Sequence, residues 1–212
     1  MNMLNEISQK LQQGNAKAVK ELVQQAVDEG CEVTAILEEG LMAGMDIVGE
    51  KFKNNEIYVP EVLIAARAMN AGTELLKPLL SSSGIKAKGK VVLGTVKGDM
   101  HDIGKNLVRM MMEGKGLEVI DLGIDVPSEK FVEVAEKENA QIIACSALLT
   151  TTMNEMKKIV DAASEAGIRE NVTIMVGGAP VTDNFRESIG ADIYKPDAAS
   201  AADAAVQACQ AR

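Results

Sequence analysis

The chain has 212 residues, of which 47% are hydrophobic and 25% charged, and 22 Lys and Arg against 31 Asp and Glu leave a formal net charge of −9. This acidic balance argues against a nucleic-acid partner, because neutralising phosphates needs a surplus of basic side chains, and an aromatic content of 2% supplies no stacking platform for bases. The apolar runs are too short for a membrane span and the first residues lack a secretory signal, so we expect a cytoplasmic protein with no membrane partner.

The first part of the chain is predicted to be helical throughout. Apolar residues recur there at three- and four-residue spacing, and turn-prone clusters separate the segments. The expected helices are residues 3–12, 16–29, 33–53 and 59–80. Residues 1–80 should therefore form a four-helix bundle, and the small, polar and basic residues 81–89 predict a linker after it.

Beyond the predicted linker, strand and helix patterns alternate through residues 90–212. The expected strands are residues 91–96, 118–122, 142–146, 173–176 and 192–193. The expected helices are residues 103–113, one opened by Pro127 and Ser128, residues 152–166, residues 185–189 and one from about residue 198. Five strands alternating with helices predict a parallel sheet covered on both faces, so the fold class is α + α/β, with a helical bundle before a flavodoxin-like (Rossmann-like) sheet.

The loop after the first predicted strand carries the one histidine of the chain, His101. Parallel sheets of this kind bind ligands at the carboxyl ends of their strands, where the strand order reverses. Asp99 lies two residues earlier and can hold one ring nitrogen, which leaves the other nitrogen for a metal. A single His without a surrounding cluster of ligands cannot make a self-sufficient zinc site, whereas a cofactor with its own equatorial ligands needs only one axial nitrogen.

Several motifs in register resemble the cobalamin-binding signature of methionine synthase and of corrinoid methyl-carrier proteins. They are Asp99-x-His101-x-x-Gly104, Ser146-x-Leu148 and Gly177-Gly178, with residues 95–98, 121–123 and 126–130 between them. The predicted bundle resembles the helical cap module of the same proteins, through GLMAGMDIVGEKF at residues 40–52 and through Tyr58-Val59-Pro60. The likeness covers nearly the whole chain, and it implies a cap domain at 1–80, a linker at 81–89 and a cobalamin-binding domain at 90–212.

The resemblance implies a cobalamin or related corrinoid whose benzimidazole is displaced from cobalt and whose nucleotide tail enters the sheet domain. His101 is then the lower axial ligand and the one metal ligand of the chain, and Asp99 is its hydrogen-bond partner. Thr152 stands where the family has a hydroxyl residue that completes the relay to this aspartate. The implied cofactor contacts are Asp99, Met100, His101, Asp102, Ile103, Gly104, Ser146, Leu148, Thr150, Thr152, Gly177, Gly178, Tyr58 and Val59.

These contacts have different implied roles. Ser146 and Thr150 bond the benzimidazole or line its slot, Gly104 lets the tail pass close to a helix, and the pair Gly177-Gly178 leaves room for the buried nucleotide. Tyr58 and Val59 cover the upper face of cobalt and shield a bound methyl group, and ordinary packing of the cap helix is an equal alternative for both.

The function implied by the resemblance is that of a corrinoid carrier subunit, not catalytic alone. It accepts a methyl group on cobalt from a substrate:corrinoid methyltransferase and delivers it to a methylcorrinoid:acceptor methyltransferase that uses a folate or a thiol. A reductive activase is a further candidate partner, and the methyl donor stays open. The alternatives are a cobalamin-dependent sensor or regulator, the cobalamin-binding subunit of a mutase, and a flavodoxin-like module for another ligand.

Overall fold

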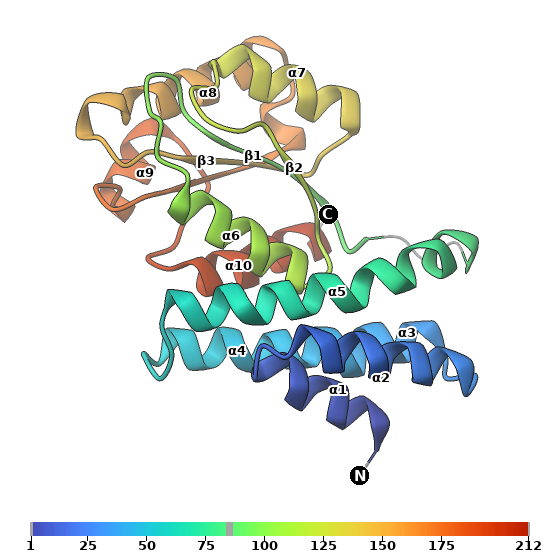
Figure 1. The fold of residues 1–212 in the computed structure, drawn as a ribbon. Helices are drawn as coiled ribbons and strands as arrows, with labels where there is room; N and C mark the ends of the chain where they lie inside the picture. The colour runs from blue at the N-terminus through green and yellow to red at the C-terminus, as the bar shows by residue number, and fades with distance from the viewer. Residues whose placement is uncertain (1, 84–86, 212) are drawn as a thin grey trace. The chain divides into compact units, whose positions relative to one another are not determined.

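The structure is a computed structural model that describes residues 2–83 and 87–211 (Figure 1). The chain divides into two compact units, Met1–Lys86 with Gly114–Gly116 and Ala87–Glu113 with Leu117–Arg212. The boundaries expected at residues 80 and 90 stay a prediction. Residues 84–86 of the expected linker lie outside the described residues. Its first residues, 81–83, continue the preceding helix, so the expected helix end at residue 80 was wrong.

The first unit is a bundle of helices with an apolar core. Its elements are α1 (Met3–Gln12), α2 (Ala16–Asp28), α3 (Val33–Ala35), the π-helical segment η1 (Ile36–Met42), α4 (Ala43–Lys53) and α5 (Val59–Ser83). The fully buried side chains of Ile7, Leu11, Val19 and Leu41 belong to this core. The helix expected at residues 33–53 is thus present, but its residues 36–42 are wound as a π-helix and not as an α-helix.

A glycine inside α4 has a packing reason. A Cβ on Gly44 would lie 3.1 Å from both the main-chain oxygen and the Cα atom of Ser8, which is in α1. Side chains in this position would push the two helices apart, so glycine permits their close approach.

The second unit is a parallel sheet with helices on both faces. Its strands are β1 (Lys90–Thr95), β2 (Glu118–Asp121), β3 (Ile142–Ser146), β4 (Thr173–Gly177) and β5 (Ile193–Tyr194). Its helices are α6 (Ile103–Gly114), α7 (Ser128–Glu138), α8 (Asn154–Glu165), α9 (Asp183–Ile189) and α10 (Ala198–Gln210), with short 3₁₀ turns η2 (Thr150–Thr152) and η3 (Arg169–Asn171). The helix expected from residue 152 begins two residues later, because Thr150–Thr152 form the turn η2.

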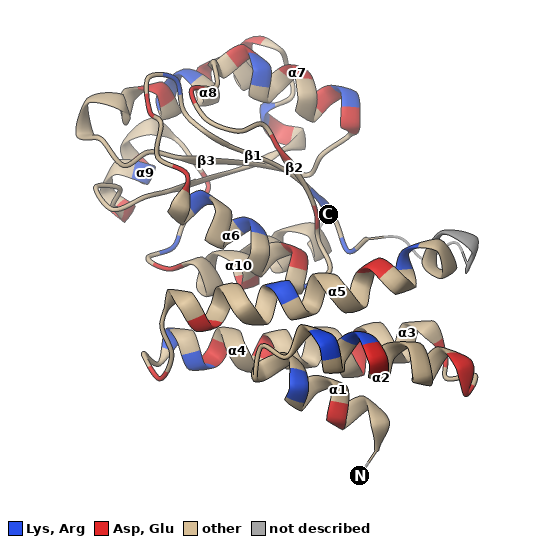
Figure 2. Cartoon of the chain, viewed as in Figure 1, with Lys and Arg blue, Asp and Glu red and all other residues tan. Residues whose placement is uncertain are grey.

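Apolar residues of the strands face both ways, as a doubly covered sheet requires. Figure 1 shows α7 and α8 on one face of the sheet and α6 and α10 on the other. Val92, Ile143 and Ile174 pack with Phe131 of α7 in one buried cluster. On the other face, α10 buries mainly alanines, and Figure 2 shows it as a largely uncharged helix.

The strand order β2-β1-β3-β4-β5 places a switch point between β1 and β3. The connections that follow these two strands leave toward opposite faces of the sheet, which opens a crevice at their carboxyl ends. Apart from Tyr58 and Val59 of the helical unit, the predicted site residues lie at the ends of β3 and β4 and on the segments that follow β1, β3 and β4. Over the described residues, we find no helix with the length and apolar character that a bilayer crossing requires.

Candidate functional site

Asp99 and His101 lie on the connection between β1 and α6, and they are in direct contact. The Nδ1 atom of His101 is 2.7 Å from the Oδ1 atom of Asp99, which also accepts the main-chain N–H of His101 at 3.1 Å. An ionised carboxylate only accepts hydrogen bonds, so Nδ1 is the donor and Nε2 carries the free lone pair. The side chain of Asp99 is fully buried, whereas that of His101 is 51% exposed.

The second carboxylate oxygen of Asp99 is held by the connection after β3. Its Oδ2 atom accepts the main-chain N–H groups of Leu148 at 2.8 Å and Leu149 at 3.1 Å, and the Thr152 hydroxyl at 3.0 Å. Thr152 Oγ1 also lies 2.9 Å from the carbonyl oxygen of Leu149, a second acceptor for its one proton. The carboxylate therefore joins the loops that follow β1 and β3 across the switch point.

These donors determine the ionisation of Asp99. Burial on its own raises the pKa of a carboxyl group, but hydrogen bonds from the His101 side chain and from the main chain of His101, Leu148 and Leu149 favour the charged form. Together they hold the pKa of Asp99 far below its usual range. The carboxylate is consequently a permanent negative charge that orients the imidazole at neutral pH.

The surface around the free Nε2 atom is apolar and open. Met100 is 64% exposed, Ile103 77%, Leu148 43% and Leu149 41%, so four large apolar side chains face solvent near one polar group. Soluble proteins rarely gather exposed apolar groups in this way without a ligand or partner. Asp102, also exposed, directly precedes α6 and accepts a hydrogen bond from the Asn106 side chain at 3.1 Å.

The predicted glycines differ in what surrounds them. A Cβ built on Gly104 or on Gly177 would meet no atom within 4 Å, so both positions border open space. Gly178 has a φ of +128°, and a Cβ there would collide with the main-chain oxygen of Ala147. The expectation that the pair leaves room for a ligand therefore applies to Gly177, because Gly178 is required by the protein's own backbone.

Ser146 and Thr150 lie at the end of β3 and in the turn that follows it. Ser146 ends β3 in register with Thr95 of β1 and Gly177 of β4, and its side chain is half-buried. Thr150 is exposed in the turn η2. Among the described residues neither hydroxyl has a hydrogen-bond partner, which leaves both free for a ligand.

Tyr58 and Val59 belong to the helical unit, at the start of α5. Tyr58 is 67% exposed, and its main-chain N–H donates to Glu61 Oε2 at 3.2 Å. Val59 is half-buried. The role expected for these residues over the cobalt stays a prediction.

A cluster of charges beside the site was not predicted from the sequence. The Nζ atom of Lys105 lies 2.6 and 2.7 Å from the two carboxylate oxygens of Asp121, and its side chain is only 2% exposed. Arg109 NH1 lies 3.1 Å from the same carboxylate. Asp121 had been noted only as part of a motif, and its position at the end of a strand was the signal that could have pointed to a partner in the next helix.

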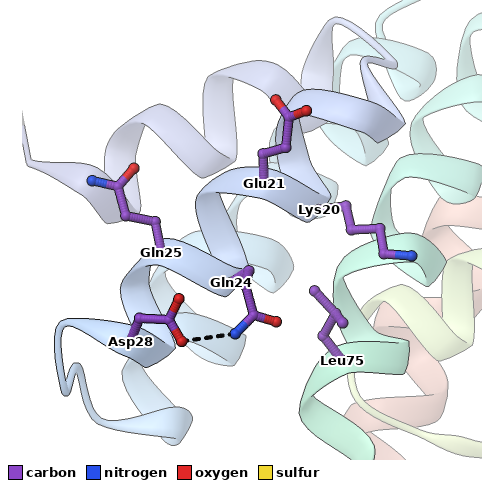
Figure 3. A pocket seen from close by; sticks show the side chains of 6 residues that line it. All are labelled: Lys20, Glu21, Gln24, Gln25, Asp28 and Leu75. Atoms are coloured by element: carbon purple, nitrogen blue, oxygen red, sulfur yellow. Dashed lines mark hydrogen bonds between the residues drawn. The ribbon is translucent and has the colours of Figure 1, made fainter.

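A separate hollow of about 450 Å³ lies on the helical unit (Figure 3). It is lined by Lys20, Glu21, Gln24, Gln25, Asp28 and Leu75. Its polar groups partly pair with one another, since Gln24 donates to Asp28 at 2.8 Å. We assign no ligand to it.

The donor set at His101 suits a metal that arrives with its own ligands. Within residues 2–83 and 87–211 no three His, Cys, Asp or Glu side chains are grouped to hold a bare ion. One open imidazole nitrogen, an apolar rim and unfilled space beside Gly104 and Gly177 fit a large, flat cofactor that needs a single axial ligand and room for a tail.

Comparison with known proteins supports this assignment over both units. Two family models, each described as a B12 binding domain, match residues 89–206 and residues 3–77. The chain is 47% identical over 176 residues to trimethylamine corrinoid protein 1 of Methanosarcina acetivorans, with 82% of each chain covered. It is 40% identical over 195 residues to a corrinoid protein of Desulfitobacterium hafniense, with 91% of this chain and 90% of the relative covered.

Solved structures agree with the sequence comparisons. The chain matches one in the methanol:cobalamin methyltransferase complex MtaBC from Methanosarcina barkeri with a TM-score of 0.88 and 32% identity, over 99% of this chain and 80% of that one. It matches a cobalamin-binding protein from Desulfitobacterium hafniense with a TM-score of 0.78 and 34% identity, over 98% and 97%. The chain therefore belongs to the B12-binding corrinoid proteins of methyltransferase systems, and its cofactor is cobalamin or a related corrinoid.

Proposed function

We propose that this chain is a methyl carrier that accepts a methyl group on cobalt from one methyltransferase and delivers it to a second. The observation that carries the proposal is the half-exposed imidazole of His101, whose Nδ1 is held 2.7 Å from a buried carboxylate. That arrangement leaves Nε2 as the atom that would hold the cobalt of a bound corrinoid, in a domain of the B12-binding family.

The protein's part in the chemistry is to control this ligand. When bound, the corrinoid supplies a cobalt ion that accepts and releases the methyl group. Asp99 fixes the tautomer and the orientation of the His101 ring through the Nδ1 hydrogen bond. Leu148, Leu149 and Thr152 hold the carboxylate, so the imidazole keeps one orientation through each cycle.

The remaining predicted residues hold the cofactor by shape. Gly104 and Gly177 border open space that would admit a nucleotide tail, and the hydroxyls of Ser146 and Thr150 would be free to bond it. Met100, Ile103 and Leu148 supply exposed apolar contacts for the corrin ring.

The partners follow from the relatives. Identities of 47% to a trimethylamine and 46% to a dimethylamine corrinoid protein of Methanosarcina acetivorans support a methylated amine as the methyl donor. The donor partner is then a methylamine:corrinoid methyltransferase. The second partner transfers the methyl group to a thiol or a folate, and a reductive activase restores the cofactor after oxidation.

The axial ligand is tested by labelling. Because His101 is the one histidine of the chain, feeding ¹⁵N-histidine labels this side chain alone. Protein loaded with cobalamin and reduced to cobalt(II) should show an electron paramagnetic resonance signal split by one axial nitrogen, and the splitting should change from a triplet to a doublet on labelling. The His101→Ala variant should lose the doublet. A wild-type splitting insensitive to the label would refute His101 as the ligand.

The carrier role is tested separately with a methylamine:corrinoid methyltransferase. Isotope-labelled methyl from trimethylamine or dimethylamine should appear on the loaded wild-type protein and pass to a thiol or folate when the second enzyme is added. Failure with every methylated amine, in a protein that passes the labelling test, would contradict the proposed donor class.

The tail site is tested by comparing two glycine variants. Gly177→Ala should leave the urea midpoint of the apoprotein unchanged but lower its affinity for cobalamin, because the added methyl group enters open space that the tail needs. Gly178→Ala should already destabilise the apoprotein, because it collides with Ala147. Equal cobalamin affinity in Gly177→Ala and wild type would remove Gly177 from the site.

A further inference from the structure

Residues 122–127, which connect β2 to α7, contact the residues that directly precede His101. The main-chain N–H of Asp125 donates to the carbonyl oxygen of Asp99 at 3.0 Å. The Oδ1 atom of Asp125 accepts the main-chain N–H of Gly98 at 2.7 Å. None of the motifs or spacings assigned a role to Asp125.

The end of β2 also contacts the segment that follows His101. Asp121, the last residue of β2, pairs with the buried Lys105 on the first turn of α6. The main-chain carbonyl of His101 itself accepts the hydroxyl of Thr95 at 2.8 Å. His101 therefore sits between two anchors that reach it from the β2 side, one at Gly98 and Asp99 and one at Lys105.

Asp125 makes its contacts from an unusual backbone conformation. Its φ is +53°, in the left-handed region that non-glycine residues seldom occupy and that Asp and Asn tolerate best. Just after it, the N–H of Val126 donates to Thr95 at 3.0 Å, which extends the pairing of this connection with the end of β1. The conformation of Asp125 thus turns both its N–H and its carboxylate toward the loop at residues 98–99.

Asp99 is consequently restrained from two sides. The connection after β3 binds its carboxylate, and Asp125 binds its main-chain carbonyl. A shift of the main chain at residues 98–99 would change the approach of the carboxylate to Nδ1, and the direction of Nε2 follows from that hydrogen bond. We propose that Asp125 is a positioning residue for the axial histidine, acting through Gly98 and Asp99. This inference rests on the proposed role of His101 as ligand.

Three substitutions separate the side chain from the backbone conformation. Asp125→Asn keeps an oxygen acceptor and tolerates the left-handed region. Asp125→Gly relieves any backbone strain but removes the acceptor, and Asp125→Ala removes the acceptor and adds strain. If the acceptor is what matters, Gly and Ala should behave alike and Asn should behave as wild type.

The readouts use the single histidine. In ¹⁵N-histidine protein loaded with cobalamin, the fraction of cobalt(II) signal that carries the nitrogen doublet should fall in Asp125→Gly and Asp125→Ala and stay at the wild-type value in Asp125→Asn. In the apoprotein, exchange of the Gly98 amide hydrogen should accelerate roughly two- to tenfold in the Gly and Ala variants, the size expected for one hydrogen bond. Thermal unfolding measured by circular dichroism should show that each variant is folded.

The outcomes distinguish this inference from the proposed function. An Asp125→Gly protein with wild-type doublet fraction overturns the role of Asp125 while His101 remains the ligand, and so does a loss confined to Asp125→Ala, which would point to backbone strain. A wild-type protein without the doublet overturns the assignment of His101 and the positioning role with it. Rescue by Asp125→Asn, together with loss in the Gly variant, supports the proposal.

Discussion

Two aspartates stand at the ends of neighbouring strands and use their charge differently. Asp99, after β1, is fully buried and receives main-chain N–H groups, a hydroxyl and an imidazole N–H. Asp121, at the end of β2, has a side chain that is 20% exposed and is paired with two full positive charges, those of Lys105 and Arg109.

The two carboxylates differ in whether one of their partner groups remains available to a ligand. Around Asp121 the cations neutralise the carboxylate, so its effect is to attach α6 to β2. Among the described residues no Lys or Arg pairs with Asp99, and the imidazole is its one exposed side-chain partner. Main-chain N–H groups and a hydroxyl thus stabilise a buried anion beside His101 without the paired cations that Asp121 has.

The largest effect is expected from Asp99→Asn. An amide has one acceptor oxygen, whereas donors approach Asp99 on both oxygens, so either orientation sets an N–H₂ group against other donors. We expect a loss of about 3 kcal/mol in the free energy of unfolding of the apoprotein. If the amide N–H₂ faces Nδ1, the proton moves to Nε2, and the axial nitrogen signal disappears.

Urea unfolding and the ¹⁵N signals of the histidine ring measure the two effects of Asp99→Asn. Asp102→Asn is the matched control, because Asp102 is exposed on the same loop. Wild-type stability with an unchanged ring tautomer would contradict the account of the donors.

Asp121→Asn should be next in size. It leaves the ammonium of Lys105, whose side chain is 2% exposed, without its counter-charge, and we expect a loss of about 2–3 kcal/mol. The double variant Lys105→Met with Asp121→Asn should regain part of this stability, because the uncompensated ammonium of Lys105 is gone. The loss in Asp99→Asn has no such remedy, because no single cation is left unpaired. A double variant less stable than both single variants would contradict this explanation.

The pH dependence of the free energy of unfolding should differ between the wild type and Asp121→Asn. Burial alone raises the pKa of Asp121, but hydrogen bonds from Lys105 and Gly123 and the charges of Lys105 and Arg109 lower it below its usual value. Between the folded and the unfolded pKa, the unfolded chain binds more protons, so this stabilisation is present above about pH 4 and is lost as the pH falls through the folded pKa. Urea midpoints measured down to about pH 3 should fall more steeply in the wild type than in Asp121→Asn. Parallel curves would show that the pair contributes nothing to acid unfolding.

The smallest effect is expected from Thr152→Val. The change removes one of the donors to Asp99 Oδ2 and keeps the shape of the side chain, so we expect a loss of about 1 kcal/mol. Thr152→Ser retains the hydroxyl and should recover most of it. A loss as large as that of Asp99→Asn would show that the hydroxyl, and not the set of main-chain donors, holds the carboxylate.

Prediction from the sequence succeeded most where the signal is local. The periodicity of apolar residues predicted the bundle and the alternating strands and helices, and the spacing of Asp99 and His101 correctly predicted that they would touch. Errors fell at element ends: α5 runs through Ser83 because serines oppose a helix only weakly, and α8 starts late because Thr150–Thr152 turn first.

The bond from Thr152 to Asp99 was implied by the family resemblance and is present, but the other contacts between distant segments were out of reach of the sequence. Leu148, 49 residues after Asp99, holds the carboxylate through its main-chain N–H, a group that every residue except proline offers and that no residue pattern marks. Gly177 faces open space, whereas a side chain at Gly178 would collide with Ala147, and only the folded chain shows where Ala147 lies. The contact of Asp125 with Gly98 depends in the same way on the pairing of β2 with β1.

The sequence by itself determined the order of the elements and the chemical groups of the site, because helices, strands and a histidine beside an aspartate are specified by neighbouring residues. Only the tertiary structure decided which main-chain donors surround Asp99, which glycine faces open space and which aspartate is neutralised by cations. Those properties arise when strands far apart in the chain align their carboxyl ends, and the physical cause is the packing of the sheet as a whole.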